Sequence, residues 1–222
     1  MERNPLAPEI LFSIGPVPIS RAVVTTWVIM AVLLIAVRIV LHRPSLRAGA
    51  AQAALEIAVE TICHQIRAII GRDPWPFVPV LGTLFIFLVC ANLAAVVPVS
   101  KPPTGHIETP AALAGIVFVS VHFFGLHARG AAGYLRHYVE PNPFMLPLNV
   151  LSELTRTFSL MIRLFGNMMS HEFVIAIVVF LAGLLVPIPF MLLGILIGII
   201  QAYIFTVLAT VYIGAAVGSV ET

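Results

Sequence analysis

Long apolar segments alternate with shorter polar ones along most of the chain. Segments 22–41, 76–98 and 110–127 reach or approach the roughly 20 residues that a helix needs to cross a bilayer core. Two longer apolar segments, 144–184 and 189–218, close the chain. Because a helix satisfies its own backbone hydrogen bonds in lipid, this pattern predicts an all-α, polytopic membrane protein. We expect the first three segments to be upright spans and the last two to form a long tilted helical hairpin.

Residues 45–71 show a different pattern, in which polar and apolar positions recur at helical spacing. One helical face collects the polar side chains of Glu56, Glu60, His64 and Arg67. Another face collects the apolar side chains of Leu55, Ile62, Ile66 and Ile69. We therefore expect an amphipathic helix that lies on the membrane surface and is ended by Arg72-Asp73-Pro74.

Composition supports a membrane protein. Of the 222 residues, 60% are hydrophobic and 10% are charged, whereas soluble domains are about 25% charged. A net charge of +2 is too small to indicate binding of nucleic acid. Arginines gather in 42–75 and in 128–143, which we expect to be a basic loop. The positive-inside rule therefore places both inside the cell, and 1–21 and 99–109 outside. We expect a single membrane domain over 1–222.

The sequence contains no motif for a metal site or for nucleotide chemistry. Cys63 and Cys90 show no Cys/Cys or Cys/His spacing typical of a metal site, and we interpret them as packing thiols. The phosphate-binding pattern GxxxxGKS/T is missing as well. We expect no cofactor and no catalytic residue, and therefore no enzyme activity of the chain by itself.

Charged residues in segment 144–184 lie at a depth where charge is costly and usually functional. A helix of about 40 residues would be about 60 Å long, so this one must lie strongly tilted or bend. At about 100° per residue, one stripe of the helix collects Arg156, Ser159, Arg163, Asn167 and Ser170. Glu172 is nine residues beyond Arg163, and so about half a turn out of phase with it. We expect this cation and this carboxylate to face different neighbours.

These polar residues also have purely structural interpretations. One pairs Arg163 with Glu153 or with backbone carbonyl groups. Asn167 could be a hydrogen-bond clip between helices, and His171 could be a histidine at the membrane interface. Helical geometry alone leaves these alternatives open.

The last segment has one deeply placed amide, Gln201. It shares a helical face with Gly194 and Gly198, and small residues on such a face let another helix come close. A packing face with one polar clip is therefore an alternative to a functional role for the amide.

The same residues carry a resemblance to a known family. Segment 151–172 resembles the signature of the a subunits of F-type rotary ATP synthases. It matches this signature at Ser159-Leu160 and at Arg163-Leu164-Phe165-Gly166-Asn167-Met168. Segment 199–213 is similar to the last helix of that family, and Asn92, Pro98 and the turn 102–109 resemble the region of its third span. The resemblance extends over about residues 5–218.

The resemblance implies an ion-translocating stator subunit in the membrane sector of an F-type ATP synthase. Such a subunit lies against a rotating ring of c subunits and forms two offset half-channels to the carboxylates of that ring. The flow of H⁺ or Na⁺ is thereby coupled to rotation and to ATP synthesis or hydrolysis. The other expected partners are b-type peripheral stalk subunits, the rest of the complex and the lipid bilayer. The expected location is a bacterial plasma (inner) membrane, with the N-terminus outside.

The resemblance also implies roles for single residues. Arg163 matches the essential arginine, which keeps the half-channels separate and makes each arriving carboxylate release its ion. The polar residues expected to line the channels are Asn167, Glu172, Gln201, His171, Ser159 and Ser170. The candidates for access from the outer side are His106 and Glu108, and those for secondary roles are Glu153, Arg156 and Asn92.

The sequence departs from the family pattern in three places. Asn149 occupies a position that is often acidic in the family, which leaves Glu153 as the nearby carboxylate. Some members have a histidine seven residues before the glutamine, where this chain has Gly194, and His171 is a candidate substitute. Some have an aspartate and an asparagine where this chain has His106 and Glu108. The alternative functions are a secondary transporter or channel that binds an anionic substrate at Arg163, and a membrane scaffold without an ion path.

Overall fold

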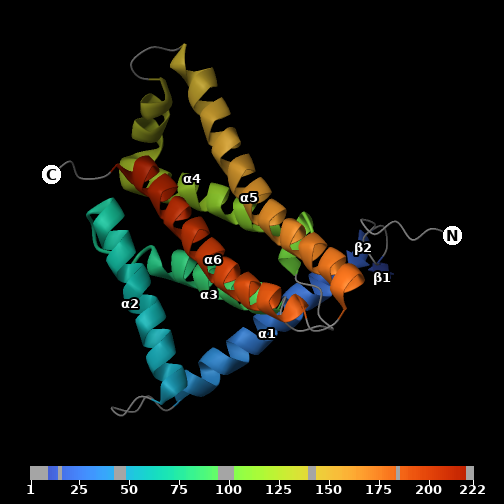
Figure 1. Cartoon of the computed structure of the whole chain (residues 1–222). Helices are drawn as coiled ribbons and strands as arrows, with labels where there is room; N and C mark the ends of the chain where they lie inside the picture. The colour runs from blue at the N-terminus through green and yellow to red at the C-terminus, as the bar shows by residue number, and fades with distance from the viewer. Residues whose placement is uncertain are drawn as a thin grey trace.

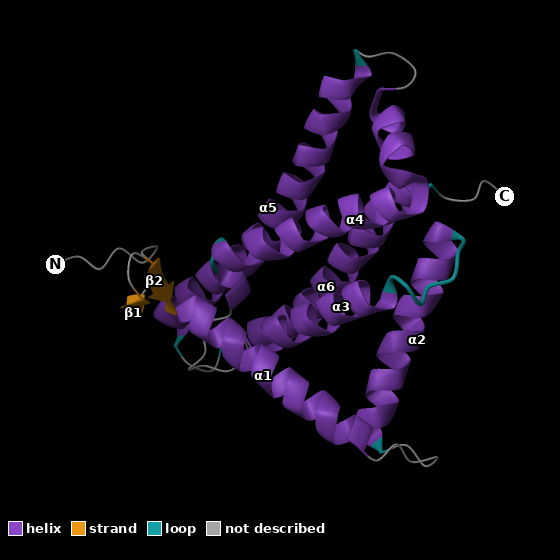
Figure 2. Ribbon diagram, turned by 180° about the vertical axis from the view of Figure 1, so that it is seen from behind, coloured by secondary structure: helices purple, strands orange, loops and turns teal. Residues whose placement is uncertain are grey.

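The computed structural model describes residues 10–14, 17–42, 49–94, 103–139, 144–183 and 186–218. Its helices are α1 (Arg21–His42), α2 (Ala50–Ile70), α3 (Val78–Leu93), the short 3-10 helix η2 (Pro103–Gly105), α4 (Glu108–Val139), α5 (Met145–Ala182) and α6 (Pro187–Val217). Figures 1 and 2 show α1 and α2 as a V whose point, where α1 ends and α2 begins, projects away from the other helices. The predicted all-α, polytopic class is confirmed.

A short hairpin precedes the helices and was not predicted from the sequence. Strands β1 (Ile10–Ile14) and β2 (Val17–Ser20) pair antiparallel, with an irregularity near Ile10. Figure 2 shows this hairpin in orange, beside the N-terminal end of α1. Residues 1–9 and 15–16 of the expected outer segment 1–21, and positions 99–102 of the expected outer turn, lie outside the described residues.

Helix α6 is the centre of the bundle. It packs against α2, α3, α4 and α5, and Figure 1 shows it crossing the middle of the molecule. At most 1% of the surface is exposed for its residues Ala202, Phe205, Ala209 and Ile213. Gly198 lies so close to α3 that a Cβ there would be 2.9 Å from the Cβ of Asn92. The glycine therefore permits the close approach that the packing-face interpretation predicted.

Helix α2 has the amphipathic character that its periodicity predicted. Ile62, Ile66 and Ile70 are buried in the core cluster that also contains residues of α3 and α6. The polar face predicted for this helix is exposed, at Glu56, Glu60, His64 and Arg67. The helix ends at Gly71, whose φ of 70° is left-handed and suits a glycine at a helix C-terminus. The end thus comes just before Arg72, where the sequence reading had placed it.

The prediction of a loop at 128–143 is wrong for most of this segment. Helix α4 continues to Val139 and is interrupted only at Gly130, where φ is 69° and ψ is 162°. A glycine can adopt this backbone conformation at little cost, so the chain changes direction at Gly130 and then continues as a helix. The basic, glycine-containing composition of the segment had indicated a loop instead. Residues 140–143 lie outside the described residues.

Helix α5 is a single helix of 38 residues, which corresponds to about 57 Å. Together with α6 it forms the long C-terminal hairpin that the sequence predicted, and Figure 1 shows the two joined at the end where α5 finishes. Among the described residues, α4 (Glu108–Ala131), α5 (Met145–Leu181) and α6 are long and apolar enough to cross a membrane. Shorter apolar helical stretches span Val23–Ile39 and Val78–Leu93.

Candidate functional site

Arg163 lies at the centre of α5, with its side chain half-buried. Leu160 and Leu164 on the same helix are at most 1% exposed and hold this part of α5 against the core. Within the described part of the chain, no side chain or carbonyl group bonds to the Arg163 guanidinium. An arginine stays charged under any protein environment, so this half-buried group is a fixed positive charge.

Glu153, the partner considered for Arg163 from the sequence, lies toward a different helix. Its Oε1 is 3.6 Å from Nδ1 of His122 on α4, and its side chain is 16% exposed. Nδ1 of His122 also lies 2.8 Å from the carbonyl oxygen of Phe118. The structural interpretation in which Glu153 neutralises Arg163 therefore finds no support in this geometry.

Helices α5 and α6 meet along a polar seam, defined here by two contacts on either side of Arg163 along α5. Toward the start of α5, the Arg156 guanidinium lies over the ring of Tyr212, 5.7 Å from its centroid. Toward its end, Asn167 Nδ2 donates a hydrogen bond to Gln201 Oε1 at 2.6 Å. The contact nearer the start of α5 is the one nearer the end of α6, so the two helices are antiparallel.

Gln201 is buried in this seam, with 3% of its surface exposed. Its Oε1 accepts the bond from Asn167, but its buried Nε2 has no hydrogen-bond partner among the described residues. A buried donor without a partner is costly and calls for a bound water or a functional explanation. The amide links α5 and α6 through Oε1 and leaves its Nε2 donor available for a further partner.

The next two residues of interest, His171 and Glu172, are adjacent in sequence but contact different elements. The His171 imidazole fills the space into which a side chain at Gly194 of α6 would project. The Glu172 carboxylate lies against η2, where a Cβ on Gly105 would be 2.6 Å from Oε1. The helix thus directs a histidine toward α6 and a carboxylate toward η2.

Asn92 of α3 joins this turn to α6. It is 2% exposed, and its Nδ2 donates to the carbonyl oxygen of Gly198 at 2.9 Å. Its Oδ1 accepts a hydrogen bond from Thr104 Oγ1 at 3.1 Å. Both ends of the amide are therefore used, and three elements are tied together at one buried point.

The other predicted polar residues lie near the polar seam or near η2. His106 is half-buried just after η2, and Glu108 is exposed in the first turn of α4, where a carboxylate is favourable for the helix dipole. Ser159 and Ser170 are exposed on α5. A groove of about 470 Å³ opens beside the seam and is lined by Leu148, Leu151, Ser152, Thr155, Arg156, Ser159 and Tyr212.

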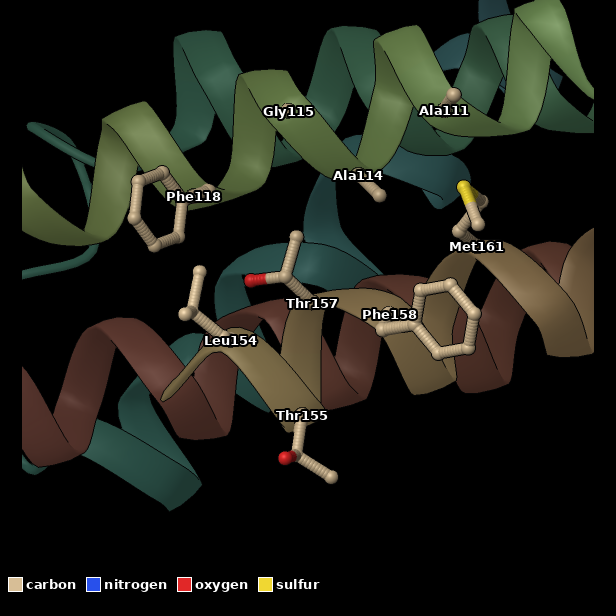
Figure 3. A pocket seen from close by; sticks show the side chains of 9 residues that line it. All are labelled: Ala111, Ala114, Gly115, Phe118, Leu154, Thr155, Thr157, Phe158 and Met161. Atoms are coloured by element: carbon tan, nitrogen blue, oxygen red, sulfur yellow. The ribbon is translucent and has the colours of Figure 1, made fainter. Parts of the chain in front are cut away.

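A second groove, of about 500 Å³, lies between α4 and α5 and is shown in Figure 3. Its lining is almost entirely apolar. In Figure 3, Phe118 and Leu154 lie between the two helices, whereas Thr155 points away from α4. An apolar lining cannot replace the hydration of an ion, so this groove is not part of the candidate site.

Sequence reasoning missed Thr104 and Gly105, which the structure places at the site. The proline-rich turn was recognised, but its contact with Glu172 brings together residues that helical periodicity cannot relate. Gly105 does not have a positive φ, so its conformation does not require a glycine. The small residue leaves room for the carboxylate, which lies where a Cβ would project.

Comparison with known proteins identifies the family of this chain. The sequence model of the family described as "ATP synthase A chain" matches residues 23–214. The protein named ATP synthase subunit a 2 of Bradyrhizobium sp. strain BTAi1 is 60% identical over 220 residues, covering 99% of each chain.

More distant relatives match over almost the same length. ATP synthase subunit a 2 of Pelobacter propionicus is 43% identical over 96% of this chain and 93% of its own length. ATP synthase subunit a of Moorella thermoacetica is 41% identical over 93% of this chain and 94% of its own length. The chain therefore belongs to the family of ATP synthase a subunits, integral proteins of the membrane sector of the F-type ATP synthase.

Proposed function

We propose that this chain forms two offset half-channels against a rotating ring of c subunits, so that a flow of H⁺ or Na⁺ drives or follows rotation. The observation that carries the proposal is the half-buried Arg163, which has no ion-pair partner among the described residues. A charge at membrane depth is costly without a partner. A carboxylate supplied by another subunit, once in each step of rotation, would be such a partner.

Arg163 would act through its permanent charge. A carboxylate that arrives with a bound ion is drawn to the guanidinium and releases the ion, because the pairing favours the ionised form. The same positive charge repels a cation that would pass directly between the half-channels. A lysine could be neutralised by burial and would then lose both effects.

The polar groups on either side of Arg163 would supply the two routes. One route includes Glu172, His171 and the outer turn with His106 and Glu108. The other would use the groove beside Arg156, with Ser159 in its lining. Asn167 and Gln201 would lie between Arg163 and the first route, and the unpaired Nε2 of Gln201 would bind water there. Ser170 would add a polar group to the same stripe.

We also propose that His171 replaces the histidine that some relatives carry at the position of Gly194. The support is spatial, since the imidazole of His171 occupies the region into which a side chain at 194 would extend. A histidine can take up and release a proton near neutral pH. One imidazole would therefore be available beside Glu172, although it is attached to α5 instead of α6.

The chain is proposed to work without a cofactor and without catalytic chemistry of its own. Its direct partners would be the ring of c subunits and b-type peripheral stalk subunits, in a bacterial plasma membrane with the N-terminus outside. Arg163 lines neither of the two grooves described above.

The test is ATP-driven ion uptake by the complete ATP synthase in sealed vesicles. We expect Arg163→Ala to abolish uptake while the complex still assembles, and Arg163→Lys to lose most of it. The matched control is Arg67→Ala, which removes an exposed arginine of α2 and should retain uptake. Coupled uptake at the normal rate in Arg163→Ala would contradict the proposal.

A further inference from the structure

The short helix η2 is an unusually buried turn. A turn between helices ordinarily runs over the surface, but here Pro103 and Thr104 are both buried, and Thr104 has no exposed surface at all. The turn packs against α1, α3, α4 and α5. It is therefore held at a defined position inside the bundle, next to the outer part of α5.

The hydrogen bonds of Asn92 fix this position. Thr104 Oγ1 donates to Asn92 Oδ1, and Asn92 Nδ2 donates to the carbonyl oxygen of Gly198. Removing the Thr104 hydroxyl would leave a buried acceptor of Asn92 without a partner, which is unfavourable. The turn thus takes its position from both α3 and α6.

Gly105 brings this fixed backbone against the Glu172 carboxylate. A Cβ on Gly105 would lie 2.6 Å from Oε1, 3.1 Å from Cδ and 3.3 Å from Oε2 of Glu172. All three atoms lie at the far end of the glutamate side chain, so an added methyl group would displace the carboxylate and leave the backbone in place. Since the φ of Gly105 is not positive, space is the reason for a glycine here.

We propose that Asn92, Thr104 and Gly105 form a seat for the Glu172 carboxylate, which sets where this group lies in the outer ion path. Asn92 and Thr104 fix the turn, and Gly105 leaves room for the carboxylate. They are positioning residues, because they act through Glu172. This inference rests on the proposed function, in which Glu172 takes part in ion transfer.

The seat can be tested by asking whether a shorter side chain at position 172 compensates for an added methyl group at position 105. In the complete ATP synthase in sealed vesicles, we expect Gly105→Ala to lower ATP-driven ion uptake roughly tenfold, since misplacing a reacting group by about 1 Å can cost still more. Glu172→Asp shortens the side chain by one methylene and should also lower uptake. The double variant should transport faster than Gly105→Ala alone, because the shorter carboxylate makes room for the methyl group.

The hydroxyl of Thr104 provides a second, independent test. Thr104→Val keeps the shape but removes the donor to Asn92, and we expect uptake to fall several-fold. Thr104→Ser keeps the donor and should retain most of the uptake. The matched glycine control is Gly115→Ala on α4, where a Cβ would meet nothing within 4 Å, and uptake should be unchanged.

The outcomes separate the seat from the role of Glu172 itself. If Glu172→Gln transports ions at the normal rate, Glu172 is not in the path, and both the seat and that part of the proposed function fail. If Glu172→Gln is impaired while Gly105→Ala and Thr104→Val are normal, only the seat fails. The seat would also be overturned if the uptake rate of the double variant Gly105→Ala with Glu172→Asp were lowered by the product of the two single effects, with no compensation.

Discussion

Two glycines on different elements receive two neighbouring side chains of α5. Gly194 leaves the space that the His171 ring fills, and Gly105 leaves the space beside the Glu172 carboxylate. Because adjacent residues of a helix point about 100° apart, one helix can present a histidine and a carboxylate to different neighbours. The size of the residue opposite each group is therefore as much a part of the site as the group itself.

At the residue scale, we predict that the histidine can be moved from position 171 on α5 to position 194 on α6. We expect Gly194→His alone to lower ATP-driven ion uptake roughly tenfold, because two imidazole rings cannot occupy one space and the displaced ring shifts its neighbours. His171→Gly alone should also be impaired, since it removes the only imidazole there among the described residues.

The double variant His171→Gly with Gly194→His should recover most of the uptake. It restores one imidazole to the shared space, now attached to α6. The measurement is the initial rate of uptake in vesicles that contain equal amounts of assembled complex. A double variant slower than either single variant would contradict the proposed substitution.

Single residues also show how far the sequence could lead. The polar character of Asn167 and Gln201 was evident, but their hydrogen bond depends on how α5 and α6 slide along one another, which no local pattern determines. The 3.6 Å approach of the Glu153 carboxylate to His122 was missed for the same reason, because His122 lies inside an apolar stretch of α4.

At the scale of elements, periodicity predicted α2 well. The isoleucines at 62 and 66 were placed on one face, and both are buried. The effects of Gly71 and Gly130 were harder to predict, because a glycine inside a helical pattern can end a helix, interrupt it or do neither. At Gly71 a left-handed φ ends the helix, whereas at Gly130 a similar φ interrupts α4 and the helix resumes.

Helix α2 allows a matched test of this packing. Ile66 is completely buried, whereas Ile57 of the same helix is 64% exposed. We expect Ile66→Ala to destabilise the chain by about 2–5 kcal/mol, since it removes buried atoms and leaves a cavity. Ile57→Ala should have little effect. The measurement is the SDS concentration at which the purified chain unfolds in detergent, and equal midpoints for the two variants would contradict the packing of α2.

At the scale of the whole molecule, large apolar side chains cover much of the surface. In α1, Trp27 is 52% exposed and Leu34 is 72% exposed, and in α5, Phe180 is 88% exposed. Such a surface is incompatible with water and suits lipid or apolar faces of partner subunits. This property was predictable from composition alone, because 10% charged residues cannot cover a chain of 222 residues.

The exposed apolar face of α1 leads to a prediction for membrane insertion. We expect Leu34→Arg to reduce the amount of correctly inserted chain, because an arginine near the centre of a span costs about 3 kcal/mol. Leu34→Phe should insert normally. The measurement is the fraction of chain that resists alkaline extraction from membranes, and equal fractions for both variants would show that this face of α1 does not contact lipid.

The bond between Asn92 and Gly198 joins residues 106 positions apart. A ribosome finishes α3, η2 and α5 before it reaches residue 198, so the tie between the outer turn and the last helix forms only when the chain is nearly complete. A truncated product would contain Arg163 and Glu172 but would lack the contact that holds η2 to α6. If the proposed seat is correct, the carboxylate of Glu172 reaches its final position only after residue 198 has been synthesised, and prematurely terminated subunits would lack this positioning.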